Sequence, residues 1–383
     1  MGKIAIKDDI YWVGAVDWSI RDFHGYSTYK GTTYNAYLAM DDKIALFDTV
    51  KSGFKEDLLY HISELTDPKS IDYLIVNHVE LDHSGCLPEI INEVQPEKIF
   101  CSPMGEKALN SHFDTTDWPI QVVKSGDTLS LGKKTVTFLE TKMLHWPDSM
   151  FSYIAEDKLL ISSDAFGQHI ASTERYADEF AIGEVMTHAA KYYANILHLF
   201  SPNVQKLLQT VAELGLEIEM IAPDHGLIWR TNPGEIIAAY DKWSKRQTKR
   251  KALVIYDSMW KSTSKMAMAI GGAISREGVS IKMMNLAVTH RSDVMTEVLD
   301  CRALVFGSPT LNNGVLPRIA DFLCYLKGLR PKGKIGAAFG SFGWSGEAVK
   351  HMEAELEAME VTLVDAKCKE LGKKIGQAVI AMG

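Results

Sequence analysis

The sequence is poor in cysteine, and the few cysteines present show no pairing pattern. Five cysteines are spread across 383 residues, and no two of them form a Cys-x-x-Cys pair. An odd and scattered set argues against a disulfide framework, a zinc site built from thiolates and a rubredoxin-type iron centre.

Long apolar runs are also missing. None approaches the roughly 20 residues that a membrane-spanning helix needs. The first residues, MGKIAIKDDIYWVGAVD, lack the apolar block and the cleavage site of a signal peptide. The sequence therefore predicts a cytoplasmic protein without a membrane segment.

Basic charge is in deficit, since the net charge is −8. This balance predicts no nucleic-acid partner. The deficit is uneven, because residues 1–251 hold 25 Lys and Arg against 36 Asp and Glu, whereas residues 252–383 hold 16 against 13. Halves of opposite charge are able to attract one another between subunits, although two differently solvated surfaces explain the asymmetry equally well.

A seam near residue 250 divides the chain. Residues 242–251 read KWSKRQTKRK, a charged segment with almost nothing to bury, and the apolar segment ALVIYDS follows at once. The length fits two or three domains. We therefore expect an α/β multidomain protein with one domain over residues 1–249 and a second over residues 250–383.

The second domain alternates short apolar strands with segments of helical spacing. Five strands separated by helices favour a parallel sheet covered on both faces, which is a doubly wound domain of flavodoxin size. The expected strands are Ala252–Asp257, Val279–Leu286, Ala303–Phe306, Ile335–Phe339 and Val361–Val364.

The first domain mixes closely spaced strands with helices, a pattern that favours sheets packed face to face with helices outside. The hairpin strands are expected at Tyr34–Met40 and Ile44–Asp48. Later strands are expected at Tyr73–Val76, Thr135–Glu140, Phe151–Ala155 and Lys158–Ser162.

Four possible metal ligands crowd into the loop after the apolar strand Tyr73–Val76. His78, Glu80, Asp82 and His83 fall within six residues. A single histidine there would usually be a structural polar residue. Carboxylates and imidazoles packed so densely repel or remain underused unless a cation neutralises them. The loop therefore predicts a metal site.

Three later residues are able to complete that site. His145 lies beside an aromatic residue, Asp164 comes just past an expected strand end, and His225 lies in a tight turn, Pro-Asp-His-Gly. Each alone is weak evidence, because a lone histidine after a strand is more often structural. Together, their order along the chain and their positions at strand ends favour a shared metal site.

The order His-x-Glu-x-Asp-His, then His, Asp and His, resembles the metallo-β-lactamase superfamily, whose two-metal site lies at the edge of an αββα sandwich. The zinc hydrolases of that superfamily typically have a second histidine where this chain has Glu80. Nitrogen and oxygen ligands with three carboxylates suit iron or manganese, although zinc and copper also bind such groups.

Glu80 is the pattern of the flavodiiron proteins, or A-type flavoproteins, and the resemblance covers essentially the whole chain. It implies an αββα metallo-β-lactamase-like sandwich followed by a doubly wound, flavodoxin-like parallel sheet. The implied ligands are His78, Glu80 and His145 for one iron, Asp82, His83 and His225 for the other, and Asp164 as the bridge.

Three loops of the second domain resemble the FMN site of flavodoxins. They lie at the carboxyl ends of expected strands, where an open α/β sheet binds its ligand. The first lacks the glycines of a Walker or dinucleotide motif, so ATP and NAD are poor candidates. The implied contacts are Ser258, Met259, Trp260, Ser262 and Thr263; then Ser308, Pro309, Thr310, Leu311, Asn312, Asn313 and Gly314; and then Ser341, Phe342, Gly343, Trp344, Ser345 and Gly346.

The resemblance implies an oxidoreductase that reduces dioxygen to water, nitric oxide to nitrous oxide, or both. Electrons would pass through FMN from rubredoxin or a reduced deazaflavin. The family also implies a head-to-tail homodimer, or a dimer of such dimers. His24, His169 and Tyr193 are candidates to donate hydrogen bonds near the metals, and Trp146 is a candidate to wall the site from water.

Two other functions fit parts of the pattern. A hydrolase with two zinc ions is typical of the superfamily, but Glu80 and the flavodoxin-like domain argue against it. An electron carrier fused to a degenerate metallo-β-lactamase domain is the other alternative. A degenerate site would be expected to have lost ligands, and all seven are present.

Overall fold

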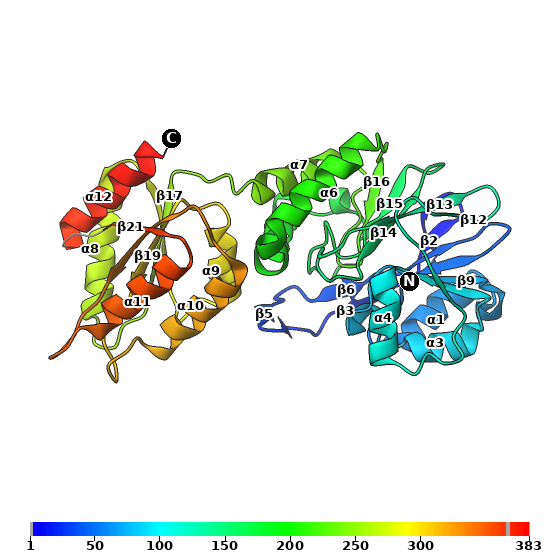
Figure 1. The fold of residues 1–383 in the computed structure, drawn as a ribbon, viewed down its shortest axis with the longest axis horizontal. Coiled ribbons are helices and arrows are strands. Elements are labelled where there is room, and N and C mark those ends of the chain that lie inside the picture. Colours follow the sequence, from blue (N-terminus) through cyan, green and yellow to red (C-terminus); the bar gives the residue numbers. More distant parts are fainter. Residues whose placement is uncertain (1–2, 365–367, 383) are drawn as a thin grey trace. The chain divides into compact units, whose positions relative to one another are not determined.

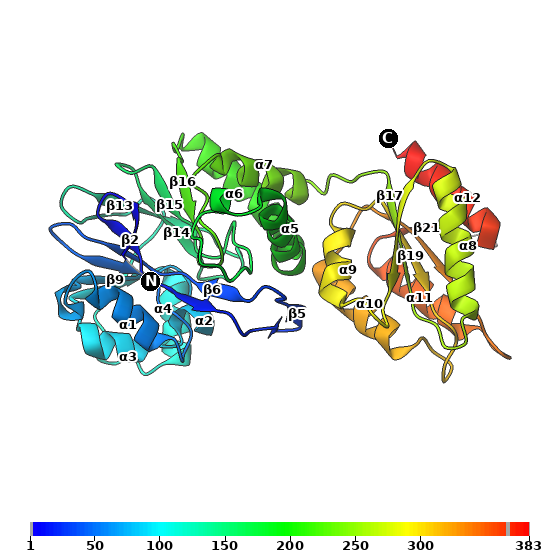
Figure 2. The same cartoon turned by 180° about the vertical axis from the view of Figure 1, so that it is seen from behind.

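The computed structural model describes residues 3–364 and 368–382. The chain forms two compact units, each of which is visible by itself in Figures 1 and 2. The first contains Met1–Phe23, Thr28–Tyr192 and Pro202–Asp241, and the second contains His24–Ser27, Tyr193–Ser201 and Lys242–Gly383. Two short segments from before residue 242, His24–Ser27 and Tyr193–Ser201, therefore belong to the second unit.

The first unit is built on a seven-stranded sheet and a five-stranded sheet. The first sheet is antiparallel from β1 to β8 and parallel from β8 to β11. Its strands in order are β1 (Ile4–Lys7), β2 (Ile10–Trp12), β7 (Tyr37–Ala39), β8 (Ala45–Phe47), β9 (Tyr73–Val76), β10 (Lys98–Cys101) and β11 (Ile120–Val122).

The five-stranded sheet is antiparallel except for its last pair, β15 and β16, which are parallel. A smaller two-stranded sheet joins β3 (Ala15–Asp17) to β6 (Thr32–Tyr34). The five strands are β12 (Thr128–Ser130), β13 (Thr135–Glu140), β14 (Met150–Ile154), β15 (Leu159–Ile161) and β16 (Met220–Ala222).

The two large sheets pack face to face. Phe47 and Ile75 from one sheet share a buried apolar cluster with Phe138 and Ile161 from the other. In Figure 1, the outer face of the seven-stranded sheet is covered by α1 (Lys55–Ser63), α3 (Leu87–Val94) and α4 (Pro103–His112). The outer face of the five-stranded sheet is covered by α6 (Ser201–Glu213) and α7 (Pro233–Ser244). The expected αββα sandwich is confirmed, and α5 (Ile182–Tyr192) completes its main helices.

The second unit has a five-stranded parallel sheet in the order β18-β17-β19-β20-β21. In strand order along the chain this is 2-1-3-4-5, the flavodoxin-like arrangement. The strands are β17 (Lys251–Tyr256), β18 (Ser280–Asn285), β19 (Ala303–Gly307), β20 (Ile335–Phe339) and β21 (Thr362–Leu363).

Helices lie on both faces of this sheet. In Figures 1 and 2, α8 (Ser262–Arg276) and α12 (Cys368–Ala381) cover one face. The other face carries α9 (Arg291–Val298), α10 (Pro317–Leu329) and α11 (Glu347–Ala358). The expected doubly wound domain is therefore confirmed.

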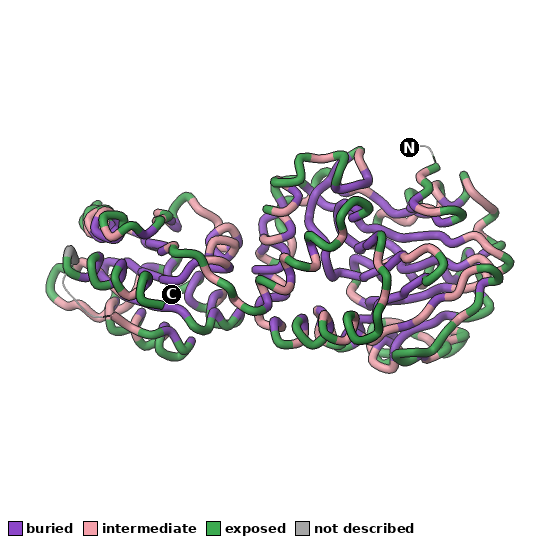
Figure 3. Tube along the Cα trace, turned by 90° about the horizontal axis from the view of Figure 1, so that it is seen from above, coloured by how far each residue is buried: buried purple, intermediate pink, exposed green. Residues whose placement is uncertain are grey.

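In both units the sheets are more buried than the helices that cover them. In Figure 3 the strands are mostly buried and the helices turn an exposed side outward. Strand β14, for example, is buried along its whole length. Across the described residues, we find no helix with both the length and the apolar character that crossing a membrane requires.

Candidate functional site

The loop with four predicted ligands begins where β9 ends. Asp48, which follows β8, holds its start: its carboxylate accepts the Asn77 backbone N–H and the Asn77 side-chain amide, both at 2.7 Å. A single helical turn, α2 (Leu81–Ser84), follows Glu80 and carries Asp82 and His83, both of which are buried. The loop is therefore fixed by a buried carboxylate that is not itself one of the predicted ligands.

The other three predicted ligands also follow strands. His145 lies between β13 and β14, Asp164 follows β15, and His225 follows β16. Because β15 and β16 are parallel neighbours, their carboxyl ends meet at one edge, and Asp224 N–H donates to the Ser163 carbonyl at 2.8 Å. The strand ends thus bring together residues that are far apart in sequence.

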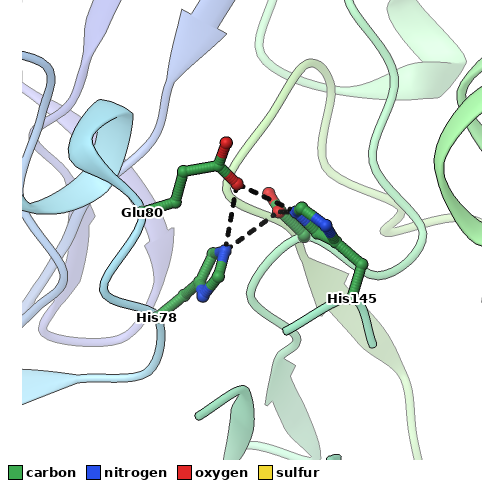
Figure 4. A group of neighbouring side chains, drawn as sticks. His78, Glu80 and His145 are labelled. Atoms are coloured by element: carbon green, nitrogen blue, oxygen red, sulfur yellow. Dashed lines mark hydrogen bonds and ion pairs between the residues drawn. The ribbon is translucent and has the colours of Figure 1, made fainter. Parts of the chain in front are cut away.

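One group of ligand atoms contains His78, Glu80, His145 and Asp164. Figure 4 shows the side chains of His78, Glu80 and His145 pointing toward one another. Glu80 Oε2 is 3.3 Å from His78 Nε2 and 3.0 Å from His145 Nε2. Asp164 Oδ2 lies 2.9 Å from His145 Nε2 and 3.6 Å from His78 Nε2, which closes the group.

A second group contains Asp82, His83 and His225. Asp82 Oδ2 is 3.3 Å from His83 Nε2 and 3.1 Å from His225 Nε2. The other oxygen of Asp164, Oδ1, lies 3.3 Å from His83 Nε2 and 3.5 Å from His225 Nε2. Asp164 therefore offers one oxygen to each group, which is the geometry of a carboxylate that bridges two cations.

The charges of the cluster favour a cation. Burial opposes protonation of His83, yet Asp82 and Asp164 raise its pKa to about 10. Burial likewise opposes protonation of His145, yet its bonds with Asp164 and Glu80 raise its pKa to about 9. The carboxylates thus create a strongly negative potential at the imidazoles, and divalent ions would replace the protons that it attracts.

Unsatisfied atoms give an independent test of fit. Within the described residues, Asp82 Oδ1, Asp164 Oδ1 and His83 Nε2 are buried and make no hydrogen bond. Buried polar atoms usually have a partner, and a metal ion is one such partner. With nitrogen and oxygen donors and no thiolate, the residues present fit two iron ions.

Two of the histidines are oriented through their second ring nitrogen. Asp148 Oδ2 lies 2.9 Å from His78 Nδ1 and accepts the Val79 backbone N–H at 2.8 Å. The Thr33 carbonyl lies 2.7 Å from His225 Nδ1. Each partner directs the remaining nitrogen, Nε2, into the cluster, which is the usual outer support of a metal-binding histidine. Neither Asp148 nor Thr33 stands in a sequence pattern that predicts this role.

The candidates for outer hydrogen bonding lie in different places. His169 packs against the cluster, with its ring centroid 4.7 Å from that of His225. Tyr193 belongs to the second unit, where its hydroxyl lies 3.1 Å from Ser201 Oγ, and His24 also belongs to that unit. Tyr192, the neighbour of Tyr193, does lie near His225, with a centroid distance of 6.0 Å, and Tyr34 lies at the same distance.

Trp146 contacts the cluster through its ring. Its centroid lies 5.2 Å from that of His78, with the two planes at 90°, and 6.1 Å from that of His145. The same ring stacks on His112 at a centroid distance of 6.5 Å. The indole therefore lies against His78 and His145, and its role in keeping water from the site stays a prediction.

The three predicted flavin loops follow β17, β19 and β20, which are adjacent in the sheet. Thr263 Oγ1 from the first loop lies 2.9 Å from Ser341 Oγ of the third, and the Thr310 backbone N–H donates to the Ser341 carbonyl at 2.9 Å. Asn312 and Asn313 both have positive φ, so the second loop makes a tight turn. All three loops therefore meet at one edge of the sheet.

Side chains in these loops divide into buried and exposed groups. Thr263 and Ser308 are fully buried, and Ser308 Oγ accepts the Leu316 backbone N–H at 2.9 Å. Trp260 and Trp344 are 88% and 92% exposed, and Phe342 is also largely exposed. Hydroxyls at a helix N-terminus fit the phosphate of a flavin nucleotide. The exposed aromatic side chains fit its ring, because the ring offers an apolar face on which they can pack.

Known proteins resemble both units and the chain as a whole. Residues 32–226 match the ODP family of beta-lactamase domains, and residues 254–378 match the flavodoxin family. The chain is 47% identical over 393 residues to a nitric oxide reductase of Moorella thermoacetica, with 98% of each chain covered. It is 50% identical over 362 residues to a rubredoxin-oxygen oxidoreductase of Megalodesulfovibrio gigas, covering 94% of this chain and 90% of the relative.

A solved structure has the same architecture throughout. The flavodiiron protein of Giardia intestinalis superposes with a TM-score of 0.95 at 34% sequence identity. The match covers 100% of this chain and 97% of the other. The likeness therefore extends over both units rather than over one of them.

Proposed function

The chain belongs to the flavodiiron proteins, enzymes whose cofactors are a diiron site and FMN, and from that premise we propose that it reduces dioxygen to water, nitric oxide to nitrous oxide, or both. The observation that carries the proposal is Asp164, which offers one oxygen to each of two groups of ligands. A shared carboxylate holds two cations close enough to act on one small substrate.

The residues divide between the two ions as their distances suggest. In this proposal His78, Glu80 and His145 hold one iron, and Asp82, His83 and His225 hold the other. Iron at these positions supplies a redox-active, Lewis-acidic pair for a diatomic gas. The chain's own part is to fix Nε2 of each imidazole in place, as Asp148 does for His78, and to shield the pair with Trp146.

Electron counting favours a flavin as the second site. Reduction of one dioxygen to two waters takes four electrons and four protons. Two ferrous ions and one fully reduced flavin hold four electrons together. Reduction of two nitric oxide molecules to nitrous oxide and water takes two electrons and two protons. In this proposal the loops after β17, β19 and β20 would hold FMN, which would supply the electrons that the diiron site needs.

The remaining assignments concern partners and assembly. One relative is named a rubredoxin-oxygen oxidoreductase, which supports rubredoxin as electron donor, and a reduced deazaflavin is the other candidate. We place the domain boundary at 249/250, just before β17 begins at Lys251. A head-to-tail homodimer in the cytoplasm completes the proposal, and the opposite charge balance of the two halves of the sequence supports it.

Gas consumption tests the proposed reaction. The full chain, loaded with iron and FMN and supplied with reduced rubredoxin, is mixed with dioxygen or nitric oxide in a sealed cell with gas-sensitive electrodes. We expect one gas or both to be consumed, without release of hydrogen peroxide. An Asp164→Ala variant should lose this activity. If the loaded wild type consumes neither gas, the proposed function is wrong.

A further inference from the structure

An apolar pocket of about 280 Å³ lies in the first unit, away from every charged group of the ligand cluster. Strands β14 and β15 form its floor, and α6 and α7 form its sides. Every lining side chain is apolar or is absent, as in glycine. Those that define it are Phe151, Leu160, Phe166, Leu207, Val211 and Ile237.

One wall of the pocket belongs to the turn that carries the bridging ligand. Phe166 lies two residues after Asp164, and its backbone is held on both sides: its N–H donates to Tyr240 Oη at 2.7 Å, and its carbonyl accepts the Trp229 indole N–H at 2.9 Å. A Cβ added to the next residue, Gly167, would lie 3.5 Å from His225 Cβ. The turn is therefore a thin partition, with the pocket on one side and metal ligands on the other.

The chemistry of the lining limits what the pocket is able to hold. No side chain in it offers a hydrogen bond or a charge, so the lining side chains do not replace the hydration that a polar or ionic ligand would lose there. An apolar cavity of this kind instead takes up small apolar molecules such as xenon. Dioxygen and nitric oxide are small molecules of that class. The Phe166 ring, which lines the pocket, also packs against the rings of Tyr240 and Phe151, at centroid distances of 4.5 and 6.3 Å.

We propose that this pocket is a binding site for an apolar diatomic gas, which it concentrates beside the metal cluster before the gas crosses the Phe166 turn. The inference rests on the proposed function, because a protein that does not consume such a gas has no use for the site. Its effect is on the capture of gas at low concentration, and it leaves the chemical step at saturating gas unchanged.

Gly234 offers a position at the pocket where an added side chain begins without a collision. It lines the pocket as the second residue of α7, and a Cβ placed on it would meet no heavy atom within 4 Å. Gly234→Trp adds an indole at the pocket, and Val211→Phe, on α6, adds a ring from the other side. Gly234→Ala is the matched control, since it removes the same helix glycine and leaves the pocket open.

Xenon is the first probe, because it reports on the pocket without any activity. Crystals of the full chain under xenon pressure should show xenon in the pocket for the wild type and for Gly234→Ala. At least one of the two filling variants should exclude it. Wild-type crystals without xenon at this position would overturn the inference.

Gas kinetics are then compared in a variant that excludes xenon. We expect kcat/KM for dioxygen or nitric oxide to fall several-fold, with kcat at saturating gas unchanged and with wild-type kinetics for Gly234→Ala. Unchanged kcat/KM in the filled variant would overturn the gas-capture role, while continued gas consumption would leave the proposed function intact. If the wild-type protein consumes neither gas, the proposed function is refuted, whether or not xenon binds in the pocket.

Discussion

At the scale of single residues, the metal cluster depends on which nitrogen each imidazole presents. Neutral histidine has one donor and one acceptor nitrogen, and the partner of Nδ1 decides which tautomer is present. Asp148 takes that role for His78, and the Thr33 carbonyl takes it for His225. Asp148 is itself held, because its backbone carbonyl accepts the Ser102 hydroxyl at 2.7 Å.

Substitution of Asp148 should weaken metal binding without removing a ligand. Asp148→Ala removes the acceptor of His78 Nδ1, and loss of such a partner typically costs about 10- to 100-fold in metal affinity. Asp148→Asn keeps an oxygen but no charge, so its affinity should fall between those of the wild type and Asp148→Ala. Iron titration of the metal-free protein measures both effects.

Asp114→Asn is the control for this experiment, because Asp114 is an exposed carboxylate that accepts from Thr116. Its iron affinity should match the wild type. If Asp148→Ala binds iron as tightly as the control does, then Asp148 has no part in holding His78.

His198 should make stability fall on mild acidification. Burial, with the charges of Lys334 and Arg246, lowers its pKa to about 4 from 6.5, against the opposing bond with the Leu329 carbonyl. Between these values the unfolded chain binds a proton that the folded chain does not, so stability decreases as pH falls, by about 2 kcal/mol near pH 5.

His198→Asn isolates that effect, because its amide is able to donate to the Leu329 carbonyl but does not titrate. Thermal unfolding midpoints of both proteins at about pH 7 and about pH 5 measure the difference. The variant should lose less stability than the wild type over this range. An equal loss in both proteins would mean that His198 titrates normally in the folded state.

At the scale of elements, the ligands lie on turns that other strands hold in place. The turn from Pro223 to Gly226, which carries His225, is held by the first residue of β7 and by a residue just before that strand. Asn35 donates from its amide to the carbonyls of Pro223 and Gly226, at 2.7 and 3.0 Å. Tyr37 donates from its hydroxyl to the Pro223 carbonyl at 2.7 Å. The turn is therefore rigid before any metal binds.

Gly226→Ala should break this turn. Gly226 has a φ of +79°, and an added Cβ would lie 1.9 Å from Gln168 Oε1 and 2.1 Å from the Gln168 carbonyl. Both the positive φ and the collision oppose a side chain at this position. The free energy of unfolding should therefore fall by more than about 1 kcal/mol, and His225 should be displaced. The iron content of the purified variant and its unfolding midpoint measure the two effects.

Gly234→Ala is again the matched control, since the same methyl group meets open space there. It should keep the wild-type iron content and be no less stable, because alanine favours a helix over glycine. Full iron content in Gly226→Ala would show that the turn does not set the position of His225.

The strands could be predicted from the sequence, and so could the residues that meet as the two groups of candidate ligands, but the side chains that support those residues could not. The apolar runs Tyr73–Val76, Thr135–Glu140 and Ile335–Phe339 are strands with those bounds, because local alternation and burial are written in neighbouring residues. Asn35 and Asp148 carry no such signal. Each acts through a partner far along the chain, 188 residues away for Asn35 and Pro223, and one sequence gives no hint of that pairing.

At the scale of the whole molecule, each unit has its own core and its own proposed cofactor site. The second unit also takes in two segments from before residue 242, His24–Ser27 and Tyr193–Ser201. Ser27 Oγ lies 2.9 Å from Ser292 Oγ, across 265 positions, and the Asn195 amide donates to the Ser292 carbonyl at 3.1 Å. A boundary drawn from composition near residue 250 does not foresee these segments, because only the folded chain brings them to α9.

Removal of each cofactor should destabilise mainly its own unit. A ligand that binds only the folded state stabilises it by about 2.7 kcal/mol at a hundred times its Kd. A strong iron chelator should therefore lower the unfolding transition of the first unit, and removal of FMN should lower that of the second. Scanning calorimetry of the full chain follows both transitions. Equal shifts of both transitions on chelation would contradict the assignment of the iron to the first unit.

The most direct test of the account is the metal and flavin content of the full chain as purified, by elemental analysis together with an absorption spectrum. The two groups of ligands, to each of which Asp164 offers one oxygen, predict two irons per chain, and the three loops of the second unit predict one FMN. That result would establish both sites at once. Two zinc ions and no flavin would contradict the account and return the chain to the hydrolases.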